Sequence, residues 1–248
     1  MQGGVILQGL VCYRDTGEKN GARTLCGVRF DAAYALRGEG MLAALSAKRA
    51  AKYLQKRRVS YAVFPKDYPY AEVFARRGVL PPPEKPLRMA KAAEIIRRAM
   101  ARLGLAPERA RIALCAPSQS AALEAAAREL SKDVRYLALC APNGERLART
   151  LRWDCGASVH TLQTDERIAA DLSVCLDDFP LPDGLVLPLE SGAVSVAYGT
   201  ENLGDAAMIW NEDQLICALY ASLARRADEI WVKDVKMPPD GGENANLP

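Results

Sequence analysis

Three cysteines stand near the carboxyl ends of predicted strands, which is where α/β proteins usually bind their ligands. Cys115, Cys140 and Cys175 fall in the first, second and fourth of four short strand-like segments. In the usual strand order 3-2-1-4 these segments are neighbours, so the thiols could form a row that binds a soft metal. A free cysteine also behaves as a small buried apolar residue, and no basic residue adjoins these three to stabilise a thiolate. We therefore favour packing over metal binding.

Small polar residues follow the first two strands, in the turns that lead into helices. Pro117, Ser118 and Ser120 occupy the first turn, and Asn143 and Gly144 occupy the second. A helix N-terminus attracts anions through its free amides and its dipole, so both turns are candidate ligand-binding positions. Capping of the helices, by Ser118 in the first turn, is the commoner use of such residues.

Asp177 completes the candidate ligand site, because it follows the fourth strand at the same edge of the sheet. Asp178 beside it suggests an acid–base pair, but adjacent residues of a strand point to opposite faces. His160 is the only histidine, and we interpret it as structural. With no C-x-x-C pair we expect no metal site, and no G-x-S-x-G or P-loop motif identifies a catalytic residue.

Strands alternate with helices in the middle of the chain. The pentapeptide Ala-Leu-Cys-Ala-Pro occurs at 113–117 and again at 138–142, each time where a strand gives way to a helix. This alternation predicts βαβ units with right-handed crossovers. The predicted fold class is α/β, a Rossmann-like parallel sheet with helices on both faces. The predicted strands are 111–116, 134–140, 158–162 and 171–176, and the predicted helices are 87–104, 118–131 and 144–153.

Residues 87–178 resemble the Rossmann-like NAD(P)-binding domain of the shikimate-dehydrogenase-like type, with 87–104 in the place of its preceding linker helix. The resemblance implies a dinucleotide at the first strand-to-helix turn. The G-x-G-x-x-G motif is absent, because 115–122 contains no glycine and Pro117 lacks the amide that would face phosphate. The acidic ribose-binding residue is also absent after the second strand. We expect a degenerate site without a bound cofactor, and NAD(P) is the alternative.

The first 86 residues are predicted to form a smaller α/β region with a hairpin of strands 4–12 and 23–30. Four prolines between 79 and 86 exclude a helix interior or central strand, so they mark a boundary. The predicted division is a domain at 1–86, a domain at 87–236 and a disordered tail at 237–248. Further predicted elements are helices at 40–57, 67–77 and 211–227, strands at 59–64 and 230–235, and a hairpin of 185–189 with 194–198.

Charge is distributed unevenly along the 248 residues. Residues 48–111 carry 17 basic and 5 acidic side chains, whereas 164–248 carry 5 basic and 16 acidic ones. Opposed regions of this kind can attract each other within or between subunits, and a basic region can attract an anionic ligand. The basic run at 48–58 suggests nucleic acid only weakly, because cations are favoured at a helix C-terminus anyway.

The composition is that of a globular protein, with half of the residues apolar and a quarter charged. No apolar run approaches the roughly 18 residues that a membrane helix needs. The N-terminus has no signal-peptide pattern, and seven cysteines are an odd number, so we expect reduced thiols and a cytoplasmic protein.

These observations leave three functional hypotheses open. The leading one is a non-redox protein that binds a small anionic ligand or a partner subunit at the carboxyl edge of the sheet. The second is an atypical NAD(P)-dependent oxidoreductase, with its dinucleotide across 116–120 and 141–145. The third is a structural subunit of a homo-oligomer that the opposed charges hold together. Because no catalytic residue can be assigned, the sequence favours a binding protein over an enzyme.

Overall fold

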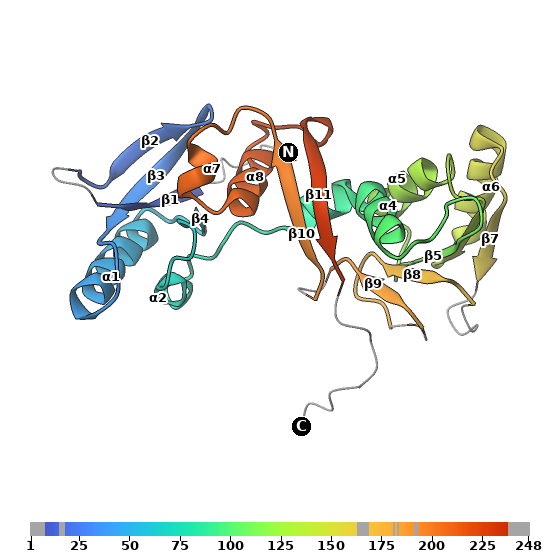
Figure 1. Cartoon of the computed structure of the whole chain (residues 1–248), viewed down its shortest axis with the longest axis horizontal. Helices are drawn as coiled ribbons and strands as arrows, with labels where there is room; N and C mark the ends of the chain where they lie inside the picture. Colours follow the sequence, from blue (N-terminus) through green and yellow to red (C-terminus); the bar gives the residue numbers. More distant parts are fainter. Residues whose placement is uncertain are drawn as a thin grey trace, which may run out of the picture. The chain divides into compact units, whose positions relative to one another are not determined.

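The chain forms two compact units, each with its own sheet (Figure 1). Unit 1 combines Met1–Glu84 with Tyr198–Trp231, and unit 2 combines Lys85–Ala197 with Val232–Pro248. The first boundary falls within the proline-rich stretch, close to the predicted one. The return of residues 198–231 to unit 1 departs from the predicted division into 1–86 and 87–236. The computed structural model describes residues 8–14, 18–162, 169–180, 182, 184–190 and 193–237.

Unit 1 contains a four-stranded sheet of β1 (Gln8–Tyr13), β2 (Gly21–Leu25), β3 (Val28–Ala35) and β4 (Tyr61–Val63). The strand order is β2-β3-β1-β4. β1 is parallel to both β3 and β4, whereas β2 pairs antiparallel with β3. The carboxyl ends of β1, β3 and β4 therefore meet at one edge of this sheet.

The predicted hairpin of 4–12 with 23–30 is wrong, because the hairpin lies within residues 21–35. Cys26 and Gly27 join β2 to β3, and their φ angles are 48° and 81°. Positive φ at both central residues gives the tight turn whose twist matches paired strands. Cys-Gly is not one of the usual sequences for this turn, so the sequence signal was weak. Residues 4–7 lie outside the described part of the chain.

The helices of unit 1 are α1 (Met41–Lys56), α2 (Ala71–Ala75), α7 (Ala206–Ile209) and α8 (Glu212–Ala221). α1 confirms the predicted helix at 40–57. Its buried face consists of four alanines and Leu54, so the helix can pack closely on β3. Phe64 and Phe74 lie under it in an aromatic core, with their ring centroids 5.2 Å apart.

Residues 198–231, which follow the first segment of unit 2 in the sequence, complete the core of unit 1. The Trp210 indole donates a hydrogen bond to the carbonyl of Val11 over 2.9 Å, and Trp210 is buried. The Gln8 amide donates to the carbonyl of Ala218 in α8 over 3.0 Å. As the sequence suggested, α8 begins at an Asn211 cap, but it ends at Ala221 rather than 227.

Unit 2 contains a five-stranded sheet of β5 (Arg111–Cys115), β6 (Tyr136–Cys140), β7 (Val159–Leu162), β8 (Leu172–Cys175) and β9 (Val186–Pro188). The order is β7-β6-β5-β8-β9 and every pair is parallel, so the predicted order 3-2-1-4 is confirmed for the first four strands. The flanking helices are α3 (Lys85–Ala90), α4 (Ala92–Arg102), α5 (Ala121–Leu130) and α6 (Gly144–Cys155) (Figure 1). The predicted α/β, Rossmann-like fold class is confirmed.

Several predicted elements of unit 2 differ in detail. The helix predicted at 87–104 is two helices, because Lys91 (φ −104°) interrupts it. The predicted hairpin of 185–189 with 194–198 is wrong, since β9 pairs with β8 as an edge strand. Most of the tail predicted at 237–248 lies outside the described residues. No helix in the described ranges is long and apolar enough to cross a membrane. A separate two-stranded sheet pairs β10 (Ser195–Thr200) with β11 (Ile230–Lys236).

Candidate functional site

The predicted site residues all lie at the carboxyl edge of the five-stranded sheet. Pro117 and Ser118 are exposed in the turn after β5, and Ser120 is the N-cap of α5. Asn143 is the N-cap of α6, and Gly144 is its first, buried residue. Asp177 follows β8.

The first turn is a capped helix start. The hydroxyl of Ser120 accepts a hydrogen bond from the amide of Leu123 over 3.2 Å. The prediction that Ser118 caps this helix is therefore wrong by two residues. The amide of Leu123 at this N-terminus is therefore already hydrogen-bonded, which reduces the number of amides that could donate to an anion.

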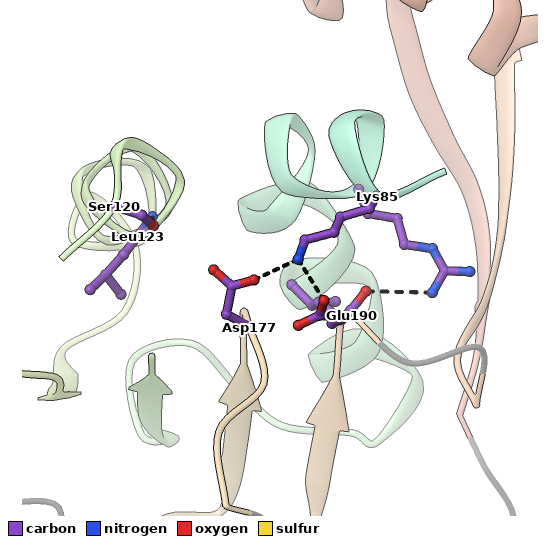
Figure 2. A network of polar contacts seen from close by, with 7 residues as sticks. Lys85, Ser120, Leu123, Asp177 and Glu190 are labelled. Carbon is purple, nitrogen blue, oxygen red and sulfur yellow. Dashed lines mark hydrogen bonds and ion pairs between the residues drawn. The ribbon is translucent and has the colours of Figure 1, made fainter. Parts of the chain in front are cut away.

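Asp177 is held in an ion pair with Lys85, at the start of α3 (Figure 2). The Lys85 Nζ lies 2.7 Å from the carboxylate of Asp177 and 2.5 Å from that of Glu190. The hydrogen bond to Asp177, and to a smaller extent the one to Glu190, raises the pKa of Lys85. The charge of Asp177 is thereby compensated, and its contact ties α3 to the end of β8. Lys85 and Glu190 were not predicted as site residues. Lys85 is 92 residues from Asp177 and 105 residues from Glu190 in the sequence.

The second turn opens into a pocket of about 960 Å³. Two predicted residues, Asn143 and Gly144, line it, whereas Pro117, Ser118, Ser120 and Asp177 are not among its lining residues. The structure therefore does not gather the predicted residues into one site. The lining residues are Gln119, Ala141, Pro142, Asn143, Gly144, Glu145, Arg146, Arg149, Thr161 and Leu162.

The start of α6 differs from that of α5. Asn143 has a left-handed backbone (φ 59°), and its side chain makes no capping hydrogen bond. The predicted use of this residue as a side-chain cap is therefore wrong. A Cβ at Gly144 would stand 3.6 Å from Leu139 and 3.8 Å from Thr161, which are ordinary contact distances, so the start of α6 packs against β6 and β7.

Two arginines that were not predicted as site residues give the pocket its positive charge. Arg146 and Arg149 are three residues apart on α6, so their side chains share one face of the helix. Both are exposed, and Glu145 is the acidic side chain in the lining. Two guanidinium groups beside the positive end of a 12-residue helix favour an anion in this pocket.

The three cysteines form the predicted row. Cys115 is in register with Cys140 on one side and Cys175 on the other, and all three are buried. Hydrogen bonding to Cys175, together with burial, raises the pKa of Cys115. No group of three or more histidine, cysteine or acidic side chains in the described residues is arranged to hold a metal ion. His160 on β7 pairs with Ala138, two residues before Cys140, and is exposed, whereas Leu162 is the β7 residue in register with Cys140.

Burial predicts how these thiols react. Treatment of the native protein with a disulfide reagent is expected to modify the exposed Cys155 quickly and the half-buried Cys26 more slowly. Cys115, Cys140 and Cys175 should react only after denaturation, because they are buried. Rapid loss of further thiols in a Cys26→Ser/Cys155→Ser variant would contradict the packing interpretation.

Comparison with known proteins identifies no family for this chain. No family model matches it, and neither does any curated protein. Among solved structures, quinate dehydrogenase from Corynebacterium glutamicum with NAD is 13% identical, with a TM-score of 0.27 over 68% of this chain and 70% of that one. A shikimate 5-dehydrogenase-like protein is 12% identical (TM-score 0.27, 74% and 71% covered). Ornithine carbamoyltransferase from Pyrococcus furiosus is 14% identical (TM-score 0.26, 69% and 60% covered). Similarity of this degree assigns no activity.

Proposed function

We propose that this protein binds a small anionic ligand, with the anion held at the start of α6 between Arg146 and Arg149. The pocket beside these arginines carries the proposal, since it is large enough for a metabolite and lies at the carboxyl edge of a parallel sheet. The amides of Gly144 and Arg146 already donate to the carbonyls of Ala141 and Asn143, so the helix contributes chiefly its dipole. Each guanidinium group can donate two hydrogen bonds to the oxygens of a phosphate or carboxylate.

Asn143 and Thr161 give this pocket a means of selection. Both line it and both carry groups that can donate or accept a hydrogen bond. Charge attraction to the arginines would hold many anions, whereas these two side chains could fix the orientation of one. Gln119 adds an amide from the turn after β5, so a ligand longer than phosphate could contact both turns.

A second candidate function is an NADP-dependent oxidoreductase. Arg146 and Arg149 favour it, because an arginine near the second turn of a Rossmann-like domain accommodates the 2′-phosphate of NADP. The turn after β5 is evidence against the oxidoreductase, because this turn has no glycine and carries Pro117 where an amide would face pyrophosphate. We therefore place simple anion binding first.

Charge reversal tests the proposal. Calorimetric titration of the full chain with inorganic phosphate, ADP, NAD and NADP identifies the best ligand. In an Arg146→Glu/Arg149→Glu variant, the affinity for that ligand is expected to fall by about a hundredfold or more, because two attractions become repulsions.

The matched control is Arg98→Glu/Arg109→Glu, which changes the net charge equally at exposed positions outside both the pocket and α6. Its affinity should stay within about twofold of the original chain, since distant exposed charges are screened. Equal affinities in the two double variants would refute the pocket as the binding site. NADP binding much tighter than both NAD and ADP would move the oxidoreductase to first place.

A further inference from the structure

The glycine pattern that unit 2 lacks occurs in unit 1, between β3 and α1. The connection reads Arg37-Gly-Glu-Gly-Met-Leu-Ala43, a G-x-G-x-x-A sequence that leads from a parallel strand into a helix. Gly38 and Gly40 have φ angles of 91° and 108°, which favour glycine. Apart from the adjoining residues of the chain, no heavy atom of the described residues lies within 4 Å of the position that a Cβ would take at either glycine. In this sequence pattern the glycines let the backbone approach a phosphate closely.

The helix that follows begins without a side-chain cap. α1 is 16 residues long, its N-cap is Gly40, and its first turn has no acidic residue. The amides of the first turn have no partner within the helix, and the dipole makes this end positive. Arg37 adds a full positive charge at the same end, where its guanidinium lies 4.8 Å above the ring of Tyr13.

A buried hydroxyl in the adjoining aromatic cluster provides independent support. Tyr68 is 8% exposed, and among the described residues its hydroxyl has no hydrogen-bond partner. The rings of Tyr13 and Tyr70 are each centred 6.0 Å from that of Tyr68. Tyr70 donates a hydrogen bond to the carbonyl of Gly40, the N-cap of α1. The unused donor therefore lies in a cluster that contacts the start of α1.

Burial keeps Tyr68 in the form that can donate. Desolvation, followed by the neighbouring Tyr13 and Tyr70, raises its pKa, so the phenol stays neutral at physiological pH. A buried donor without an acceptor destabilises a fold, which makes a ligand oxygen a natural partner here. Tyr68 also follows β4, whose carboxyl end lies at the same edge as those of β1 and β3.

We propose that unit 1 has an anion site of its own, which binds a phosphate group between the N-terminus of α1 and the tyrosine cluster. The first amides of α1 donate to the phosphate oxygens, Arg37 offsets their charge, and the hydroxyl of Tyr68 donates to one more oxygen. Glu39 lies in the same loop and opposes the anion, so its removal should tighten binding. Free phosphate and the phosphate of a nucleotide share this chemistry.

The test uses the full chain with Arg146→Glu/Arg149→Glu, so that the pocket of unit 2 no longer contributes. Titration with inorganic phosphate, followed by calorimetry and phosphorus NMR, is expected to show one bound equivalent. Adding Tyr68→Phe, which removes only a hydroxyl, should weaken phosphate binding by about tenfold or more. Arg37→Gln should weaken it similarly, and Glu39→Gln should strengthen it.

Tyr53→Phe is the matched control, because it removes a hydroxyl in the later turns of α1, outside the proposed site. Equal phosphate affinities in the Tyr68→Phe and Tyr53→Phe chains, or no bound phosphate at all, would overturn the proposal. AMP that binds tighter than phosphate identifies a nucleotide, and equal affinities identify free phosphate. These readings hold whether or not the pocket of unit 2 binds an anion.

Discussion

Residues 1–84 produced without the rest of the chain are expected to remain unfolded, although they contain all four strands of the unit 1 sheet. Without residues 198–231 the sheet loses α8, the indole of Trp210 and the hydrogen bond from the amide of Phe64 to Gln214. Burial of one large aliphatic side chain is worth about 1.5–3 kcal/mol, and Leu215, Ile216 and Leu219 are fully buried. Their loss is comparable to the whole stability of a domain, about 5–15 kcal/mol.

Circular dichroism with urea titration measures this effect. The fragment 1–84 should show no cooperative transition, and supplying 198–231 as a second chain should restore one. The matched fragment is 1–84 supplied with a 198–231 chain that carries Trp210→Ala, where restoration should be weaker. A sharp urea transition in the fragment alone would show that the N-terminal residues fold without their C-terminal partner.

Phe74→Ala is expected to lower the free energy of unfolding of unit 1 by about 3–5 kcal/mol, the usual cost of emptying a buried phenylalanine site. Phe74 is fully buried, and its ring is 5.2 Å from that of Phe64 and 5.9 Å from that of Tyr68, edge-on to both. Such aromatic pairs add to the loss beyond the buried area. The surrounding rings are rigid, so the cavity cannot collapse completely.

Urea denaturation of the full chain gives this value when a signal from unit 1 is followed, such as the fluorescence of the buried Trp210. Trp153→Ala is the control, since that side chain is 91% exposed and its removal should change stability by less than about 0.5 kcal/mol. A loss at Phe74 as small as the loss at Trp153 would contradict the close packing of the aromatic core.

Unit 2 could be predicted from its sequence because its structure is locally encoded. Each strand from β5 to β8 is a short apolar run, and the right-handed rule for parallel crossovers then restricts the order. Unit 1 could not be predicted in the same way. β1 pairs with β3 and β4 rather than with the strand that follows it, and the return of 198–231 leaves no periodic signal in the sequence.

The candidate site was predictable only in part, for a similar reason. Asn143 and Gly144 could be placed because a strand-to-helix turn is recognisable, and both line the pocket. Arg146 and Arg149 resemble the solvated face of any helix, so only the pocket distinguishes them. The network of Lys85, Asp177 and Glu190 joins distant segments, which a single sequence does not reveal.

Each unit is built from two separate segments of the chain, and this arrangement also affects when each unit can assemble on the ribosome. Unit 1 begins at the N-terminus, but its last elements leave the ribosome only after residues 85–197 have been made. At about 5–20 residues per second, that interval lasts roughly 6 to 23 seconds. During it the apolar segments of residues 1–84 that later pack with residues 198–231 stay unfolded and exposed, so synthesis rate and chaperone access should affect the yield of unit 1 more than that of unit 2.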